Sequence, residues 1–240
     1  MSPLDRLSQA EAILRHDPVQ NAYPLLRIAQ GQIADCDVIG NSVRLRDAEN
    51  GKTMYCIYSF AEFCALYKVC NESPANVSLV TDDQFVIDIP RLDSALQFNV
   101  FYQLLAPEHL PVEPVEGVTF IGIGAEHIDW ILSVYQHPEL NPAFIMRRAA
   151  APNALAVSEG KPIGFFMSHC DAELGPAYVA PEFRGGGLAT QLLARVAAEF
   201  RMRGTRPVLY VHPENMRSLR WLLKSGCTLC PQKTVWFWRE

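Results

Sequence analysis

Several features that would assign a chain to a class directly are missing from this sequence. No apolar run in its 240 residues reaches the ~18 that a helix needs to cross a bilayer. Residues 1–8 hold no basic stretch followed by an apolar one, so we expect no secretory signal. No low-complexity tract is present, and 49% of the residues are hydrophobic against 20% charged. The sequence therefore predicts a folded protein of one large domain or two small ones, without a membrane partner.

An excess of positive charge is also absent. The chain has 21 Lys and Arg against 26 Asp and Glu, which gives a formal net charge of −5. Proteins that bind nucleic acid carry a basic face, so we expect no nucleic-acid partner. A cationic amine is compatible with this charge balance as a substrate.

A disulfide framework is not expected either. Seven cysteines, an odd number in a chain of this length, fit a reduced, cytoplasmic protein better. Cys227 and Cys230 form the only close pair, and no second pair offers the other two ligands of a structural zinc ion. We expect these two side chains to pack in the core and expect no metal. Redox or metal chemistry at the pair is the alternative.

The N-terminal part, residues 1–106, mixes helical and strand patterns. Apolar residues at helical spacing predict a helix near residues 4–14, and a second helix is expected between Pro18 and Gly31. Further patterns predict strands at 36–39, 42–46, 53–59, 77–81 and 96–104, and a helix at 60–69. No site is evident in this part. It is expected to shape a substrate site or a homodimer contact.

Three prolines between Pro107 and Pro114 predict a stiff, extended connection at 107–117 and a domain boundary there. Residues 118–240 then alternate between strand and helix patterns. Asn141 before Pro142 predicts the start of a short helix. The stretch 235–238, a valine followed by three aromatic residues, predicts a buried edge of a sheet, and the alternative is an apolar wall of the acceptor pocket or a subunit contact.

The most distinctive stretch is a strand, a glycine-rich turn and a helix. A strand is predicted at 174–180 and a helix at 188–203, with Gly185, Gly186 and Gly187 between them. Consecutive glycines at a helix start cost backbone entropy, so a ligand that approaches bare N–H groups is the expected reason for them. Those groups and the helix dipole bind anions. The stretch therefore predicts a site for a phosphate-bearing ligand.

Three kinds of phosphate-binding loop contain a glycine-rich turn of this type. No Lys follows Gly187, which argues against an ATP or GTP loop. A dinucleotide fingerprint fits only in its first half, because Thr190 replaces the third glycine. The third pattern, Arg/Gln-x-x-Gly-x-Gly/Ala, is met by Arg184-Gly-Gly-Gly-Leu-Ala189.

This third pattern, with Tyr-Val-x-Pro-Glu-x-Arg upstream, resembles the coenzyme A loop of the GNAT superfamily of N-acyltransferases. The resemblance spans about residues 118–240, where the strand at 208–212, Asn215 and Gly226 follow in the family order. It implies an α/β fold with a mixed sheet, preceded by a smaller mixed α/β domain. That N-terminal domain is either a degenerate copy of the same fold or a separate one.

In this family the loop amides hold the pyrophosphate of acetyl-CoA, and the preceding strand pairs with its pantetheine arm. The implied cofactor contacts are Tyr178, Val179, Ala180, Arg184, Gly185, Gly186, Gly187, Leu188, Ala189, Asn215 and Ser218. Asn215 is also expected to cap the helix that follows it. The resemblance further implies that side chains between Trp130 and Arg148 help to choose the amine, although Trp130 itself is expected in the core.

Acetyl transfer to an amine needs a base that takes a proton from the ammonium. Glu173 is the first candidate, since some family members place a catalytic glutamate at the corresponding position; the alternative is a surface strand residue. His212 is the second candidate, and its alternative is a turn residue before Pro213. The family often has a Tyr as general acid four residues before the last helix's glycine. Leu222 takes that position here, so the general acid stays open.

The leading hypothesis is an acetyl-CoA-dependent N-acetyltransferase that acts on a small metabolite or an amino-acid-like amine. A protein lysine or N-terminal acetyltransferase is the alternative within the same class. A catalytically weak CoA-binding regulator and a nucleotide-binding module are the alternatives from other classes.

Overall fold

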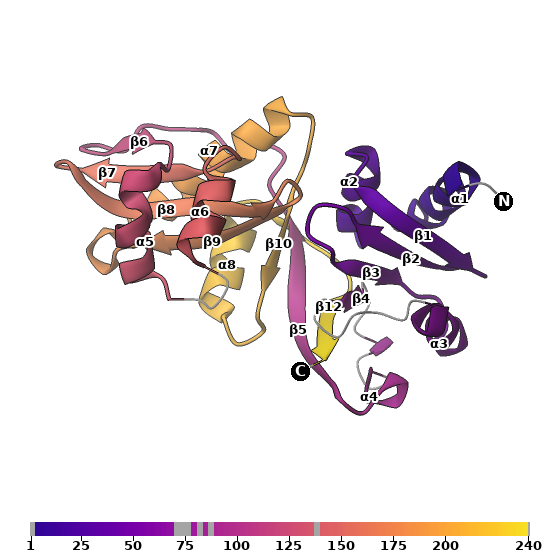
Figure 1. Ribbon diagram of the computed structural model, residues 1–240. Coiled ribbons are helices and arrows are strands. Elements are labelled where there is room, and N and C mark those ends of the chain that lie inside the picture. Colours follow the sequence, from indigo (N-terminus) through magenta and orange to yellow (C-terminus); the bar gives the residue numbers. More distant parts are fainter. Residues whose placement is uncertain (1–2, 70–77, 81–83, 86–88, 137–139, 240) are drawn as a thin grey trace. The chain divides into compact units, whose positions relative to one another are not determined.

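The computed structural model describes residues 3–69, 78–80, 84–85, 89–136 and 140–239 (Figure 1). The chain divides into two compact units. The first unit contains Met1–Leu105, Tyr210–Leu223 and Thr228–Glu240, and the second contains Ala106–Leu209 and Lys224–Cys227. Neither unit is a continuous half of the chain. The proposal that 1–106 and 118–240 are separate domains stays a prediction.

The first unit holds a mixed sheet with the strand order β1-β2-β3-β4-β12-β5. Strands β3 and β4 are parallel, whereas the other neighbours in this order are antiparallel, and β11 also pairs with β5. The strands are β1 (Ile33–Ile39), β2 (Ser42–Asp47), β3 (Thr53–Cys56), β4 (Ser78–Val80), β5 (Leu96–Leu105), β11 (Thr228–Leu229) and β12 (Thr234–Arg239). The strands predicted from residues 36, 42, 53, 77 and 96 onward all overlap strands of this sheet.

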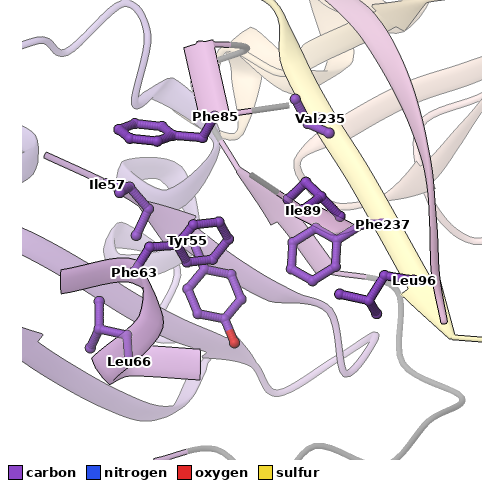
Figure 2. Close-up of a cluster of buried hydrophobic side chains, with 9 residues drawn as sticks. All are labelled: Tyr55, Ile57, Phe63, Leu66, Phe85, Ile89, Leu96, Val235 and Phe237. Atoms are coloured by element: carbon purple, nitrogen blue, oxygen red, sulfur yellow. The ribbon is translucent and has the colours of Figure 1, made fainter. Parts of the chain in front are cut away.

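The core of the first unit is an aromatic cluster on one face of this sheet. Figure 2 shows Tyr55 and Phe237 from two strands beside Phe63 from α3. The rings of Tyr55 and Phe63 are 5.2 Å apart, and those of Phe63 and Phe237 are 6.2 Å apart. The helices assigned to this unit are α1 (Pro3–Leu14), α2 (Ala22–Ala29), α3 (Phe60–Val69) and α4 (Ile89–Leu92), and α8 (Met216–Lys224) begins in it. The helix predicted at 60–69 is confirmed at both ends.

Strand β12 is an interior strand of its sheet, so the prediction of an edge at 235–238 is wrong. It pairs with β4 on one side and with β5 on the other. Val235 and Phe237 are 0% and 1% exposed, and both lie in the cluster of Figure 2. Val235 and Phe237 thus face the core, while Trp236 and Trp238 are half-buried. The position of the strand between two neighbours is something that short-range patterns do not reveal.

The second unit holds the strands β6-β7-β8-β9 and the start of β10, in that order. All pairs are antiparallel except β9 with β10, which is parallel. The strands are β6 (Thr119–Ile121), β7 (Ala154–Ser158), β8 (Lys161–Cys170), β9 (Glu173–Val179) and β10 (Val208–Val211). The mixed α/β fold with a mixed sheet is confirmed.

Helices cover both faces of this second sheet. Helices α5 (Ile128–Val134) and α6 (Pro142–Arg148) cross one face (Figure 1). Asn141 caps α6 as predicted, because its Oδ1 accepts from the N–H of Phe144 at 2.9 Å. Helix α7 (Leu188–Met202) packs on the other face, where Gly164 and Val179 of adjacent strands face Leu192.

The proline-rich segment 107–117 belongs to the second unit and is held against α7. The side chain of Gln191 accepts from the N–H of Glu113 at 2.5 Å and donates to the carbonyl of Pro111 at 3.4 Å. At the start of the segment Arg206 Nε donates to the carbonyl of Ala106 at 2.7 Å. The segment is thus held in place by hydrogen bonds from Gln191 and Arg206, which lie about 80 to 100 residues later in the sequence.

Candidate functional site

The glycine-rich loop joins the end of β9 to the start of α7. A single turn of 3-10 helix, η3 (Pro181–Phe183), leaves the strand, and Arg184 follows it. Arg184 Nε donates to the carbonyl of Val179 at 2.8 Å, which ties the loop back to the strand. Gly187 is the N-cap of α7 and has a φ of +84°, a left-handed conformation that glycine adopts without strain.

Bare backbone donors line this loop. Among the residues that the structure describes, none accepts a hydrogen bond from the N–H groups of Gly185, Gly186 or Gly187. The first helical bond of α7 runs from the N–H of Gln191 to the carbonyl of Gly187, so the first N–H groups of the helix have no acceptor in the helix. A Cβ atom on any of the three glycines would meet nothing within 4 Å. The loop therefore offers unobstructed donors at the positive end of a helix dipole, as an anion site requires.

Strand β9 pairs with β8 near both of its ends, from Glu173 to Val179. Only its first two residues, Glu173 and Leu174, also pair with β10 on the other side. Within the described part of the chain, no pairing with β10 continues beyond Leu174. The later half of β9 therefore has one edge that an extended ligand could pair with, next to the loop.

Tyr178 belongs to an aromatic group on the α5 face of the sheet. Its ring is 6.3 Å from that of Phe165 and 6.1 Å from that of Trp130, and the guanidinium of Arg184 lies 5.9 Å from it. Trp130 is half-buried and packs against the core of the second unit, as expected. This packing fixes the strand end from which the loop departs.

Glu173 lies at the opposite end of β9 from the loop. The residue is 3% exposed, so the alternative of a surface strand residue is wrong. Its backbone pairs with Cys170 on β8 and with Val208 on β10. A buried carboxyl in the short paired stretch just before two parallel strands separate is a suitable location for a base, and its catalytic role stays a prediction.

His212 belongs to the first unit, whereas Glu173 and the loop belong to the second. The His212 side chain is 44% exposed, and its Nδ1 accepts from the N–H of Glu214 at 3.3 Å. Its ring lies 5.8 Å from that of Phe101. The backbone of His212 forms the turn before α8, because its carbonyl accepts from the N–H of Asn215 at 2.8 Å. This agrees with the alternative prediction, a turn residue before Pro213.

Asn215 caps α8, as predicted, since its Oδ1 accepts from the N–H of Ser218 at 3.1 Å. Contact of either residue with a cofactor stays a prediction. Leu222 is 3% exposed and lies in the core, so this position offers no proton donor.

Cys227 and Cys230 are both buried thiols, as predicted. Burial raises the pKa of the Cys227 thiol to about 12. Cys230 Sγ lies 3.3 Å from the carbonyl of Val19, to which it donates. Among the described residues there is no group of three His, Cys, Asp or Glu side chains suited to a metal ion. No described helix has both the length and the apolar character required to span a bilayer.

Sequence reasoning missed the buried polar side chains of the second unit. Arg148, Asn153 and Gln191 are each less than a tenth exposed, and each bonds to backbone far away in the sequence. No local pattern marks them, because their partners come from other elements.

Comparison with known proteins supports the family resemblance. The model of the GNAT acetyltransferase family matches residues 122–227. A Drosophila protein of known structure has a TM-score of 0.68 at 13% identity, with 100% of this chain and 97% of that chain covered. A GCN5-related N-acetyltransferase from Kribbella flavida has a TM-score of 0.57 at 14% identity, covering 93% and 96%. A GCN5-related N-acetyltransferase-like protein from Streptococcus suis has 0.54 at 15%, covering 97% and 100%.

No curated protein matches the chain. At these identities the solved structures establish the fold, and they do so over nearly the whole chain. The family match identifies a GNAT acetyltransferase domain at residues 122–227.

Proposed function

We propose that the protein is an acetyl-CoA-dependent N-acetyltransferase that acts on the primary amine of a small metabolite or an amino-acid-like acceptor. The observation that carries the proposal is the row of bare N–H groups on the three glycines at the start of α7, beside the open edge of β9. This arrangement suits a long ligand that has a pyrophosphate at one point and an amide-containing arm at another.

The loop residues fit such a ligand on two grounds. The space around the three glycines is free of side chains, and their donors have no acceptor among the described residues. The residues that would hold acetyl-CoA are those of the loop, 184–189, and of the strand end, 178–180. Asn215 and Ser218 stay predicted cofactor contacts. Acetyl-CoA would supply the activated acetyl thioester.

In this proposal Glu173 takes a proton from the ammonium form of the acceptor, directly or through a water molecule, and so frees the nitrogen lone pair for attack. The protein holds both reactants in one ternary complex, and this alone contributes much of the rate. Leu222 cannot protonate the departing thiolate, so that proton comes from water, from the protonated nitrogen of the tetrahedral intermediate or from a Tyr elsewhere in the chain. His212 is the second candidate for the base.

Ligand binding tests the proposal first. Acetyl-CoA and CoA are expected to raise the midpoint of thermal unfolding, because a ligand that binds the folded state stabilises it by mass action. NAD is expected to leave the midpoint unchanged. Stabilisation by NAD alone would instead identify a nucleotide-binding module.

Turnover tests it second. Release of free thiol from acetyl-CoA is measured with glycine, phenylalanine, spermidine and a lysine-containing peptide. Turnover of a free amine supports the proposal, whereas turnover of the peptide alone favours a protein acetyltransferase. Tight acetyl-CoA binding without turnover of any amine favours a CoA-binding regulator.

A further inference from the structure

The side chain of Arg148 closes the turn through which β8 leads into β9. Its Nε donates to the carbonyl of Ser168 at 3.1 Å, and its Nη2 donates to the Ser168 hydroxyl at 3.0 Å and to Asp171 Oδ1 at 2.9 Å. Arg148 is 5% exposed, and Ser168 is fully buried. A buried guanidinium with several charge-assisted or carbonyl partners is held in one orientation.

The turn held in this way is irregular at the residue that Arg148 contacts. The pairing of β8 with β9 changes register on both sides of Ser168, which faces Leu174. One step further Cys170 faces Glu173. Such irregularities redirect the side chains beside them and need support from outside the ladder. The direction of the Glu173 carboxylate thus depends on a backbone that Arg148 fixes.

Arg148 is itself anchored on a rigid support. It ends α6, and the following connection is fixed by Asn153, whose Nδ2 donates to the carbonyls of Ala149 and Ala151 at 2.8 Å each. The Oδ1 of the same side chain accepts from the N–H of Ile123 at 2.7 Å. The Ser168 hydroxyl donates in turn to the carbonyl of Pro152 at 3.2 Å. The turn before β9 is therefore bound to the end of α6 by side chains from both sides.

We propose that Arg148 is a positioning residue that holds the Glu173 carboxylate at the paired start of β9 and β10. This inference rests on the proposed function, in which Glu173 is the base. The sequence predicts instead that side chains up to Arg148 help to choose the amine. The Arg148 guanidinium bonds to Ser168 and Asp171, so we assign it a positioning role and not contact with the amine. A correctly placed base requires a supporting shell of this kind, since small displacements cost large factors in rate.

The test compares Arg148→Lys with Arg201→Lys. Lysine keeps the charge and loses the planar fork of the guanidinium, and Arg201 is an exposed arginine in the last turn of α7. The assay uses acetyl-CoA with whichever of the four amines named above the wild type turns over fastest. Arg148→Lys is expected to lower kcat about 10- to 100-fold, with the KM for acetyl-CoA within about twofold of wild type. Arg201→Lys is expected to match wild type.

A double-mutant cycle with Glu173→Gln separates positioning from general stability. If Arg148 acts through Glu173, adding Arg148→Lys to Glu173→Gln lowers kcat no further. Equal kcat in the two lysine variants, or losses that multiply in the double variant, would overturn the inference. A wild type that does not bind acetyl-CoA in the thermal assay, or binds it and turns over no amine, would refute the proposed function, and this inference with it.

If Arg148→Lys does not fold, Asp171→Asn takes its place in the cycle. This substitution removes the half-exposed partner of the ion pair and leaves both bonds to Ser168. A kcat loss of about two- to fivefold that disappears in the Glu173→Gln background supports the inference. An unchanged kcat, or an equal loss in both backgrounds, contradicts it.

Discussion

The two ends of strand β9 differ in solvent exposure and in the kind of polar group that they present. At its C-terminal end, exposed glycines present backbone N–H groups to open space. At its N-terminal end, Glu173 is buried and pairs with neighbours on both sides, beside a turn that the buried Arg148 holds. The glycine loop after the C-terminal end thus offers backbone donors to solvent. The N-terminal end instead holds buried polar side chains.

This contrast suggests a division of labour. Backbone donors at a helix start bind an anion whatever the neighbouring side chains are, so they suit a constant feature of a ligand. A buried carboxyl depends on everything around it, because burial and neighbouring charges set its protonation. Binding and chemistry should therefore respond to different substitutions, and four substitutions test this separation.

The largest effect is expected for Gly187→Glu. The new carboxylate would fill the loop and repel a pyrophosphate, so acetyl-CoA should bind roughly a hundredfold more weakly or not at all. Isothermal titration measures the loss. Gly204→Glu is the matched control, because Gly204 follows the other end of α7, has a φ of +71° and also faces open space. Undiminished binding in Gly187→Glu would show that the loop serves another purpose.

The next effect is expected for Glu173→Gln, which keeps the shape of the side chain and removes its basicity. We expect kcat to fall by about 10²–10⁴, the range typical of a lost general base, while the Kd for acetyl-CoA stays unchanged. Steady-state kinetics and titration calorimetry check the two halves. A variant that keeps its kcat would move the role of base to His212, whose replacement by Gln is then the comparison.

A smaller effect is expected for Gly164→Ala. Gly164 lies on β8, the strand that pairs with β9 near both of its ends. A Cβ at Gly164 would lie 2.9 Å from the carbonyl oxygen of Tyr178 and 3.3 Å from Leu192. The backbone of β9 would have to move, at a cost of about 1–3 kcal/mol in the free energy of unfolding. Chemical denaturation measures this, with Gly122→Ala as control, because a Cβ there has one neighbour at 3.9 Å. Equal stability of the two variants would show that β8 and β9 adjust freely.

The smallest effect is expected for Gly186→Ala. A Cβ here meets no atom and no left-handed conformation is required, so reduced freedom of the unfolded chain should stabilise the protein by about 0.4–1 kcal/mol. The methyl group would at the same time crowd a bound anion and weaken acetyl-CoA binding a few-fold. Thermal unfolding with and without ligand detects both changes. Destabilisation of the ligand-free protein would show that the glycine is needed for folding.

The two ends of β9 also differ in how far the sequence predicts them. The loop was predicted correctly as strand, glycines and helix, because its signals lie within a few neighbouring residues. The burial of Glu173 was not predicted, since it depends on strands and helices from distant parts of the sequence. The interior position of β12 was mispredicted for the same reason. The hydrogen bonds that Gln191 and Arg206 make with the backbone of residues 106–113 are also beyond prediction, because the partners lie far apart in the sequence.

The place of β12 also has a consequence for the order in which the protein can fold during synthesis. This strand lies between β4 and β5, yet it is the last strand of the chain. Every residue of the second unit leaves the ribosome before it. The edges of β4 and β5 that pair with β12 therefore stay unpaired until β12 has been synthesised. Unpaired strand edges can associate with other chains. A ribosome-bound or prematurely ended chain would be the form of this protein most dependent on chaperones.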